Sequence, residues 1–128
     1  MKISTTLNPL QRRILAVLEE AGEDDIAALT NTVEERVGLV SEIDDMGNAL
    51  TNLICSELLQ IARFRNVATL RWVPLNKAES LDLLTNLVTL LKWSVPDQLW
   101  RWPKHLDRAQ VLLTKAGLIE ARRIIDQD

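Results

Sequence analysis

The sequence is poor in the residues that mark disulfides, irregular loops and aromatic-rich sheets. Its 128 residues include one Cys, four Gly, four Pro, one Phe and no Tyr. The single Cys, Cys55, excludes an internal disulfide and a cysteine-based metal cluster. Few Gly and Pro disfavour long irregular segments, and few aromatics disfavour an all-β fold, because strands favour aromatic side chains. We therefore expect a mainly α protein.

Long apolar runs are missing as well. The most apolar stretch, residues 81–91, contains Asp82 and is too short to span a bilayer. The first residues, MKISTTLNPLQRR, have no apolar core of signal-peptide length. We therefore expect a cytoplasmic protein with no membrane association. A hydrophobic content of 47% and a charged content of 26% indicate one domain over residues 1–128.

The sequence also lacks the groups that catalysis needs. The only His, His105, has no nucleophile near it in the sequence, and Cys55 lies on a predicted helix where burial explains it better than reactivity. The adjacent acidic pairs fall at helix ends, where capping accounts for them. There is no Gly-rich phosphate loop and no His-x-x-x-His spacing. We expect no enzyme, no cofactor and no metal site.

Charge is distributed unevenly. Residues 1–60 contain four Lys/Arg and eleven Asp/Glu, a balance of −7, whereas residues 61–128 contain eleven Lys/Arg and seven Asp/Glu, a balance of +4. Since opposite charges attract, an anionic partner should prefer the second half of the chain.

Helix signals dominate the first half. Asn8 is a good N-cap, Pro9 suits the first helical position, and Gly22 suits the position after the end, which predicts a helix over residues 9–21. A second helix is expected from an acidic cap at residue 24 or 25 to Val33. The stretch 34–42, interrupted by Gly38, is interpreted as a turn with some helix.

A third helix begins near Ile43, and periodicity alone permits it to continue to Phe64. A second interpretation ends it earlier, because residues 59–65 and 67–73 are rich in strand-favouring residues, with a turn at Asn66. The phrase Leu50-x-x-Leu53-x-x-x-Glu57-Leu58-Leu59 resembles the end of the recognition helix in winged helix-turn-helix transcription regulators. In that pattern Gly stands where this chain has Glu57, because the backbone leaves the helix in a left-handed conformation.

The resemblance covers residues 9–75 and implies a winged-helix-like three-helix core with a small β-hairpin wing. It also implies duplex DNA as a partner, read from the third helix and held by the wing. The implied DNA-binding residues are Asn48, Thr51, Asn52, Arg63, Arg65 and Arg71. Against this, residues 43–57 contain no Lys or Arg but three acidic residues, and phosphate neutralisation usually supplies most of the affinity.

Residues 76–128 are expected to form a helical extension to that core. The helix through residues 81–91 is apolar on more than one face, which indicates burial on two sides. The second side is expected to be another subunit, so that the chain forms a homodimer. The expected interface residues are Leu83, Leu84, Leu87, Leu90 and Leu91. The alternative to DNA binding is a winged-helix module that contacts only proteins, as an adaptor or assembly subunit.

Overall fold

A computed structural model describes residues 7–65, 71–103 and 108–127. Six helices and six strands follow one another in these ranges, in the order α1 (Pro9–Ala21), β1 (Glu23–Asp25), α2 (Ile26–Val33), α3 (Val40–Cys55), β2 (Leu59–Arg65), β3 (Arg71–Pro74), α4 (Lys77–Thr85), α5 (Leu87–Leu90), β4 (Lys92–Ser94), β5 (Leu99–Arg101), β6 (Ala109–Leu113) and α6 (Lys115–Gln127). Within these ranges, none of the helices has both the length and the hydropathy that crossing a bilayer requires.

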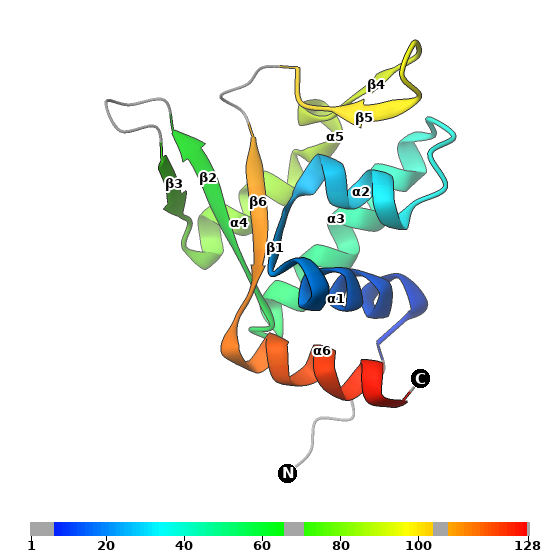
Figure 1. The fold of residues 1–128 in the computed structure, drawn as a ribbon. Helices are drawn as coiled ribbons and strands as arrows, with labels where there is room; N and C mark the ends of the chain where they lie inside the picture. The colour runs from blue at the N-terminus through cyan, green and yellow to red at the C-terminus, as the bar shows by residue number, and fades with distance from the viewer. Residues whose placement is uncertain (1–6, 66–70, 104–107, 128) are drawn as a thin grey trace.

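The main sheet joins distant parts of the sequence. Its four strands are antiparallel and lie in the order β1-β6-β2-β3, so the C-terminal strand β6 sits between two strands of the first half. Ile61 of β2 is opposite Val111 of β6, and both are fully buried. Helices α1, α2 and α3 cover one face of the sheet, and α6 returns along α1 (Figure 1). The strands β4 and β5 form a separate hairpin beside the loop between α2 and α3.

The expected mainly α fold with a helical extension is therefore wrong, because the chain is mixed α/β. The extension contributes β6 to the interior of the sheet, and it contributes the hairpin β4–β5. The expected wing is not a free hairpin either, since β2 pairs with β6 on the side opposite β3. The sequence of β6, Ala-Gln-Val-Leu-Leu, is too short for its hydrophobic pattern to distinguish a strand from a helix. Pairing with a partner strand therefore decides its secondary structure.

The end signals of the first helix are confirmed. The side chain of Asn8 accepts a hydrogen bond from the backbone of Gln11, and the side chain of Gln11 accepts one from the backbone of Asn8. Pro9 is the first helical residue, and Gly22 ends the helix with φ 84°. This reciprocal box satisfies two backbone N–H groups that the first turn would otherwise leave unpaired.

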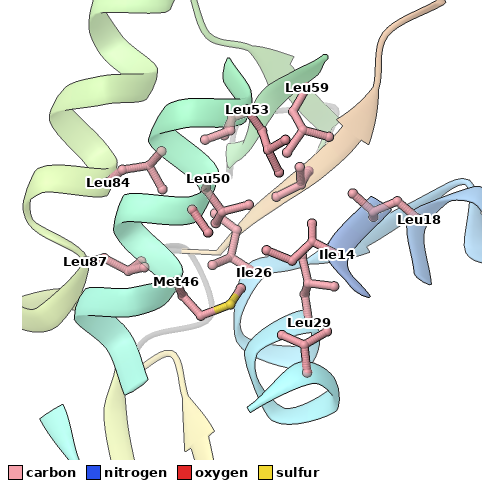
Figure 2. Close-up of a cluster of buried hydrophobic side chains, with 14 of the residues drawn as sticks. Ile14, Leu18, Ile26, Leu29, Met46, Leu50, Leu53, Leu59, Leu84 and Leu87 are labelled. Atoms are coloured by element: carbon pink, nitrogen blue, oxygen red, sulfur yellow. The ribbon is translucent and has the colours of Figure 1, made fainter. Parts of the chain in front are cut away.

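The helix α3 is buried on two sides. Ile14 of α1 and Leu29 of α2 pack on one side, and Leu84 and Leu87 of α4 and α5 pack on the other (Figure 2). Gly47 permits this approach, because a Cβ there would lie 3.3 Å from the carbonyl oxygen of Leu84. The helix expected over residues 81–91 begins earlier, at an Asn76 cap, and is divided between α4 and α5 at Asn86.

The third helix ends near the position that the resemblance indicates. The last helical residue is Cys55, and Glu57 has a left-handed backbone with φ 62°. The strand β2 then covers residues 59–65, as the strand interpretation predicted, and a single helix to Phe64 is excluded. A left-handed backbone at a non-Gly residue costs about 1 kcal/mol, so the rest of the structure must hold Glu57 in place.

Candidate functional site

The residues expected to read DNA lie along the solvent side of α3. Asn48 and Asn52 are exposed and one helical turn apart, whereas Thr51 is half-buried toward α4 and α5. Asp44 and Asp45 are exposed on the first turns of the same helix. The exposed stripe of α3 therefore combines two amides with two carboxylates, and no Lys or Arg occurs in this helix. Such a stripe offers hydrogen bonds to bases but no cation for phosphates.

The three expected wing arginines lie on β2 and β3. Arg65 is opposite Arg71 in the strand register, at the end of β2 farthest from α3, and Arg63 is opposite Val73. Arg71 is exposed and Arg63 is half-buried. The turn at 66–70 and the side chain of Arg65 lie outside the described residues, as does His105. The backbones of Arg65 and Arg71 are thus opposite each other in the sheet, whereas Asn48 and Asn52 belong to α3.

The leucines expected at a dimer interface lie inside the protomer. Leu83 and Leu84 of α4, Leu87 of α5 and Leu91 are buried against the chain's own core, and Leu90 is half-buried. The second apolar side of this segment therefore packs on α3 of the same chain, which accounts for its hydrophobicity without a second subunit. The homodimer itself stays a prediction.

The features of catalysis and metal binding are sparse where the structure describes the chain. Cys55 is exposed at the end of α3, not part-buried as its helical position suggested. Among residues 7–65, 71–103 and 108–127, no three His, Cys, Asp or Glu side chains are grouped so that they could hold a metal ion. These observations give no chemical centre on which to build a reaction.

A different feature, which the sequence did not reveal, is the loop between α2 and α3. Glu42, on the first turn of α3, is only 5% exposed and turns back into this loop. Its Oε1 accepts hydrogen bonds from the backbone N–H of Gly38 at 3.0 Å and of Leu39 at 3.2 Å, and its Oε2 accepts one from Val37 at 3.3 Å. One buried carboxylate thus fixes three successive backbone groups.

The hairpin β4–β5 holds the same loop from its other side. The indole Nε1 of Trp100 donates to Oε1 of Glu42 at 3.2 Å, and Trp100 packs edge-on against Trp93 with ring centroids 5.3 Å apart. Gly38 lies flat on Trp93, since a Cβ at Gly38 would come within 2.8 Å of the ring. Asn31 of α2 accepts from the backbone N–H of Trp100 and donates to its carbonyl oxygen, at 2.8 and 3.0 Å.

The electrostatics of Glu42 fit this role. Burial pushes the pKa of its carboxyl upward, but hydrogen bonds from Val37, Trp100, Gly38 and Arg36 outweigh burial, so the pKa lies below its usual value. Hydrogen bonds to a carboxylate stabilise the charged form, and each is stronger than a bond between neutral groups. The ionised Glu42 is therefore the form that organises the loop.

This rigid loop presents apolar side chains to solvent. Val37, Leu39 and Val40 are 57%, 58% and 55% exposed, and Val95 at the hairpin turn is 72% exposed. We call these four residues the loop–hairpin surface. They account for four of the seven exposed large hydrophobics of the described residues. The hairpin and the loop are neighbours in Figure 1, and Gly38 of the loop packs against Trp93 of the hairpin. Clustered exposed apolar side chains are typical of interaction sites.

The loop–hairpin surface is bordered by negative charge. Residues 34–45 contain five acidic side chains and one basic one, Arg36. Burial, reinforced by the charges of Asp45 and Glu42 and partly offset by Arg13, raises the pKa of Glu34 to about 7. The Oε2 atom of Glu34 is buried and has no hydrogen-bond partner among the described residues. Burial is the largest cause of this pKa shift, and the carboxylates of Asp45 and Glu42 add a repulsive contribution to it.

A signal for this site was present in the sequence, although it was ambiguous. The run Val37-Gly38-Leu39-Val40 is apolar and spans the end of the loop and the first residue of α3, and an apolar run is unusual in a loop. Its role depends on Trp100, which lies 58 residues away from Glu42 and helps to hold the loop by donating to that carboxylate.

Comparison with protein-family models, with curated proteins and with solved structures found no match.

Proposed function

We propose that this protein is a non-enzymatic interaction module that binds a protein partner through the loop–hairpin surface. The observation that carries the proposal is the combination of exposure and rigidity. Leu39 is more than half exposed, yet its backbone N–H is bonded to a buried carboxylate. A surface that is already ordered loses less conformational entropy on binding, so its apolar area contributes more to affinity.

The charges around the surface favour a particular partner chemistry. With five acidic residues and one basic residue over positions 34–45, the net charge is −4 when all are ionised. A partner segment that presents apolar side chains between lysines or arginines is therefore complementary. The apolar contacts supply affinity, and the opposite charges increase the association rate, an effect that added salt weakens.

Site-specific photo-cross-linking in the cells that naturally produce the protein tests this. A benzophenone amino acid at Leu39 is compared with one at Ile119, which is 63% exposed on α6 and provides the matched control. We expect one dominant protein adduct from position 39 only, at a partner segment with apolar and basic residues. Equal adducts from both positions, or none from 39, would overturn the proposal, and an adduct to a second copy would replace it with the homodimer.

Duplex DNA is the second candidate, favoured by the resemblance to winged helix-turn-helix regulators and by the exposure of Asn48 and Asn52 on one side of α3. Fluorescence anisotropy with random duplex DNA at low salt measures it. The protein-binding proposal expects no affinity in the micromolar range. Salt-sensitive binding that Arg71→Glu removes would support DNA instead, because Arg71 is exposed and a salt-dependent affinity reports phosphate contacts.

A further inference from the structure

A recess lies between α2, the strand β5 and the start of β6. It is an open cleft of about 440 Å³ to which both Arg101 and Arg108 contribute. The small side chains of Ala27 and Ala28 line it on the α2 side, and Trp102 lines it on the β5 side. Trp100 lines the cleft and also donates to Glu42, but none of the four residues of the loop–hairpin surface lines the cleft, so a ligand bound in it would contact other side chains than the proposed protein partner.

Most polar groups in the cleft are already used. The carboxylate of Asp25 accepts the backbone N–H groups of Ala27 and Ala28, and it accepts the Trp102 indole N–H at 2.8 and 2.9 Å. The amide of Asn31 is occupied by the backbone of Trp100. The side chains of Arg101, Arg108 and Trp102, which also line the cleft, remain for a ligand.

Arg108 is held in place by two aromatic rings. Its guanidinium lies over the rings of Phe64 at 4.9 Å and Trp72 at 5.6 Å, and these two rings pack edge-on against each other. No carboxylate of the described residues pairs with it, and its Nε atom is buried without a hydrogen-bond partner. A stacked guanidinium is pre-organised for an oxyanion, and a buried donor without a partner is unfavourable.

The two arginines indicate a phosphate more than a carboxylate. Arg101 makes an ion pair with Asp97 at 2.6 Å, in which both side chains are about half exposed, and so it retains donors that can turn toward the cleft. One guanidinium saturates the two oxygens of a carboxylate, whereas a phosphate has three terminal oxygens and two charges to share. The indole of Trp102 is held by its bond to Asp25 and lines the cleft, and an indole is a side chain against which a ligand ring packs well.

We propose that this cleft binds a nucleoside monophosphate, with the phosphate held by Arg108 and Arg101 and the base packed against Trp102. Because the cleft is open, the sugar stays in solvent. Because the phosphate and the ring contact separate groups, their contributions to binding should combine in one molecule and be weak when they are separated.

Isothermal titration calorimetry of the full chain with AMP, inorganic phosphate and adenosine tests this. We expect AMP to bind at least about tenfold more tightly than either fragment, since it engages both subsites. Arg108→Gln should weaken AMP binding about tenfold or more, to the level of adenosine, because a bidentate charged contact is lost. Arg122→Gln, on the exposed face of α6, is the matched control and should bind like wild type.

The outcomes that overturn the proposal are equally definite. No detectable binding of AMP at about 10 mM would exclude the site, since a dissociation constant above that value corresponds to very little binding free energy. AMP that binds no better than phosphate would also exclude it, because the ring would then contribute nothing. Unchanged binding by Arg108→Gln also excludes it. If that variant fails to fold for want of its stacking contacts, Arg101→Gln replaces it. The side chain of Arg101 is 57% exposed, and its loss should still weaken AMP binding by about threefold or more.

Discussion

The two ends of α3 are each next to a left-handed backbone residue, and different contacts hold the backbone at each end. Each is flanked by a non-Gly residue with a left-handed backbone, Arg36 with φ 58° before the helix and Glu57 with φ 62° after it. At the C-terminal end the backbone is held by the sheet: Thr114 donates through its hydroxyl to the carbonyl oxygen of Glu57 and through its N–H to that of Leu58. The exposed side chains of this turn, Ser56 and Glu57, are polar.

At the N-terminal end the backbone is held by a single buried carboxylate, and the groups that it fixes are apolar and exposed. A buried carboxylate and a left-handed residue both cost stability, and a fold alone gains little from exposing valine and leucine. The difference separates strain that closes a sheet from strain that presents a surface. It is the reason for assigning binding to the first end of α3 and structure to the second.

The largest expected effect concerns the C-terminal end. A Cβ at Gly117 would lie 1.9 Å from the carbonyl oxygen of Leu58, so Gly117→Ala must separate α6 from the turn after α3. We expect a loss of about 3 kcal/mol or more in the free energy of unfolding, measured by urea denaturation. Gly22→Ala is the control, because its Cβ meets nothing within 4 Å and only its positive φ is costly. Equal losses in both variants would contradict a packed turn.

Removal of the Glu42 carboxylate tests the N-terminal end. Glu42→Gln leaves one acceptor for four donors and places an amide N–H₂ among them, so we expect a loss of about 2 kcal/mol relative to wild type. Hydrogen exchange should show faster exchange at Gly38 and Leu39 in this variant. Glu35→Gln, at an exposed position of the same loop, is the control and should change neither measurement.

The same residue gives a pH dependence with a definite sign. The pKa of Glu42 is lower in the folded protein than its ordinary value of 4.5. Such a group stabilises the fold above pH 4.5, and this contribution is lost as the pH falls through the folded-state pKa. The stability difference between wild type and Glu42→Gln should therefore shrink in acid. A stability difference that stays constant from pH 7 to about pH 3 would contradict the assignment of loop binding to the ionised Glu42 carboxylate.

A smaller effect of the opposite sign is expected at Glu34. Its pKa is raised from 4.5 to about 7, so the folded protein resists ionisation that the unfolded chain accepts, and stability is lost as the pH rises from 4.5 through 7. Glu34→Gln should be more stable than wild type at pH 8 by about 1 kcal/mol, since solvent screening reduces the full effect of the shift. The two melting temperatures should converge near pH 4, and a gap that persists there would refute the assignment.

The smallest expected effect returns to the C-terminal end. Glu57→Gly relieves the left-handed backbone at a residue whose side chain is exposed, which should stabilise the protein by up to about 1 kcal/mol. The gain is reduced because Gly also increases the entropy of the unfolded chain. Chemical denaturation with the neighbouring control Ser56→Gly, whose φ is −85°, measures it. A loss at Glu57 as large as that at Ser56 would mean that this turn is not strained.

Local signals made parts of this fold predictable. The caps at Asn8, Pro9 and Gly22 and the composition of β2 are encoded within a few residues, and the structure places both elements as expected. The strand β6 was missed because its partner β2 lies far away in the sequence. Ala109 of β6 is opposite Arg63 of β2, 46 positions earlier. Likewise, the apolar residues of segment 81–91 already indicate two buried sides, but only the tertiary structure shows that α3 covers the second.

The candidate site was less predictable than the fold. The exposed asparagines of α3 follow from helical periodicity, so their placement was within reach of the sequence. The hydrogen bonds that Glu42 makes to the loop were not predictable. In the sequence Glu42 is one more acidic residue at a helix start, and only the fold brings Trp100 and the three loop N–H groups to it. A buried carboxylate has no sequence signature apart from the partners that surround it, and those lie in other elements.

The most direct test of the central claim is the affinity of the cross-linked partner, once identified, for two variants of this chain. Leu39→Asp removes an apolar contact of the loop–hairpin surface and adds a charge there, whereas Ile119→Asp makes the same change at an exposed residue of α6. Isothermal titration calorimetry should show affinity about tenfold or more weaker for Leu39→Asp, equivalent to about 1.4 kcal/mol, with unchanged thermal stability. Ile119→Asp should bind like wild type. Binding by Leu39→Asp that equals wild type would contradict the assignment of partner binding to the N-terminal end of α3.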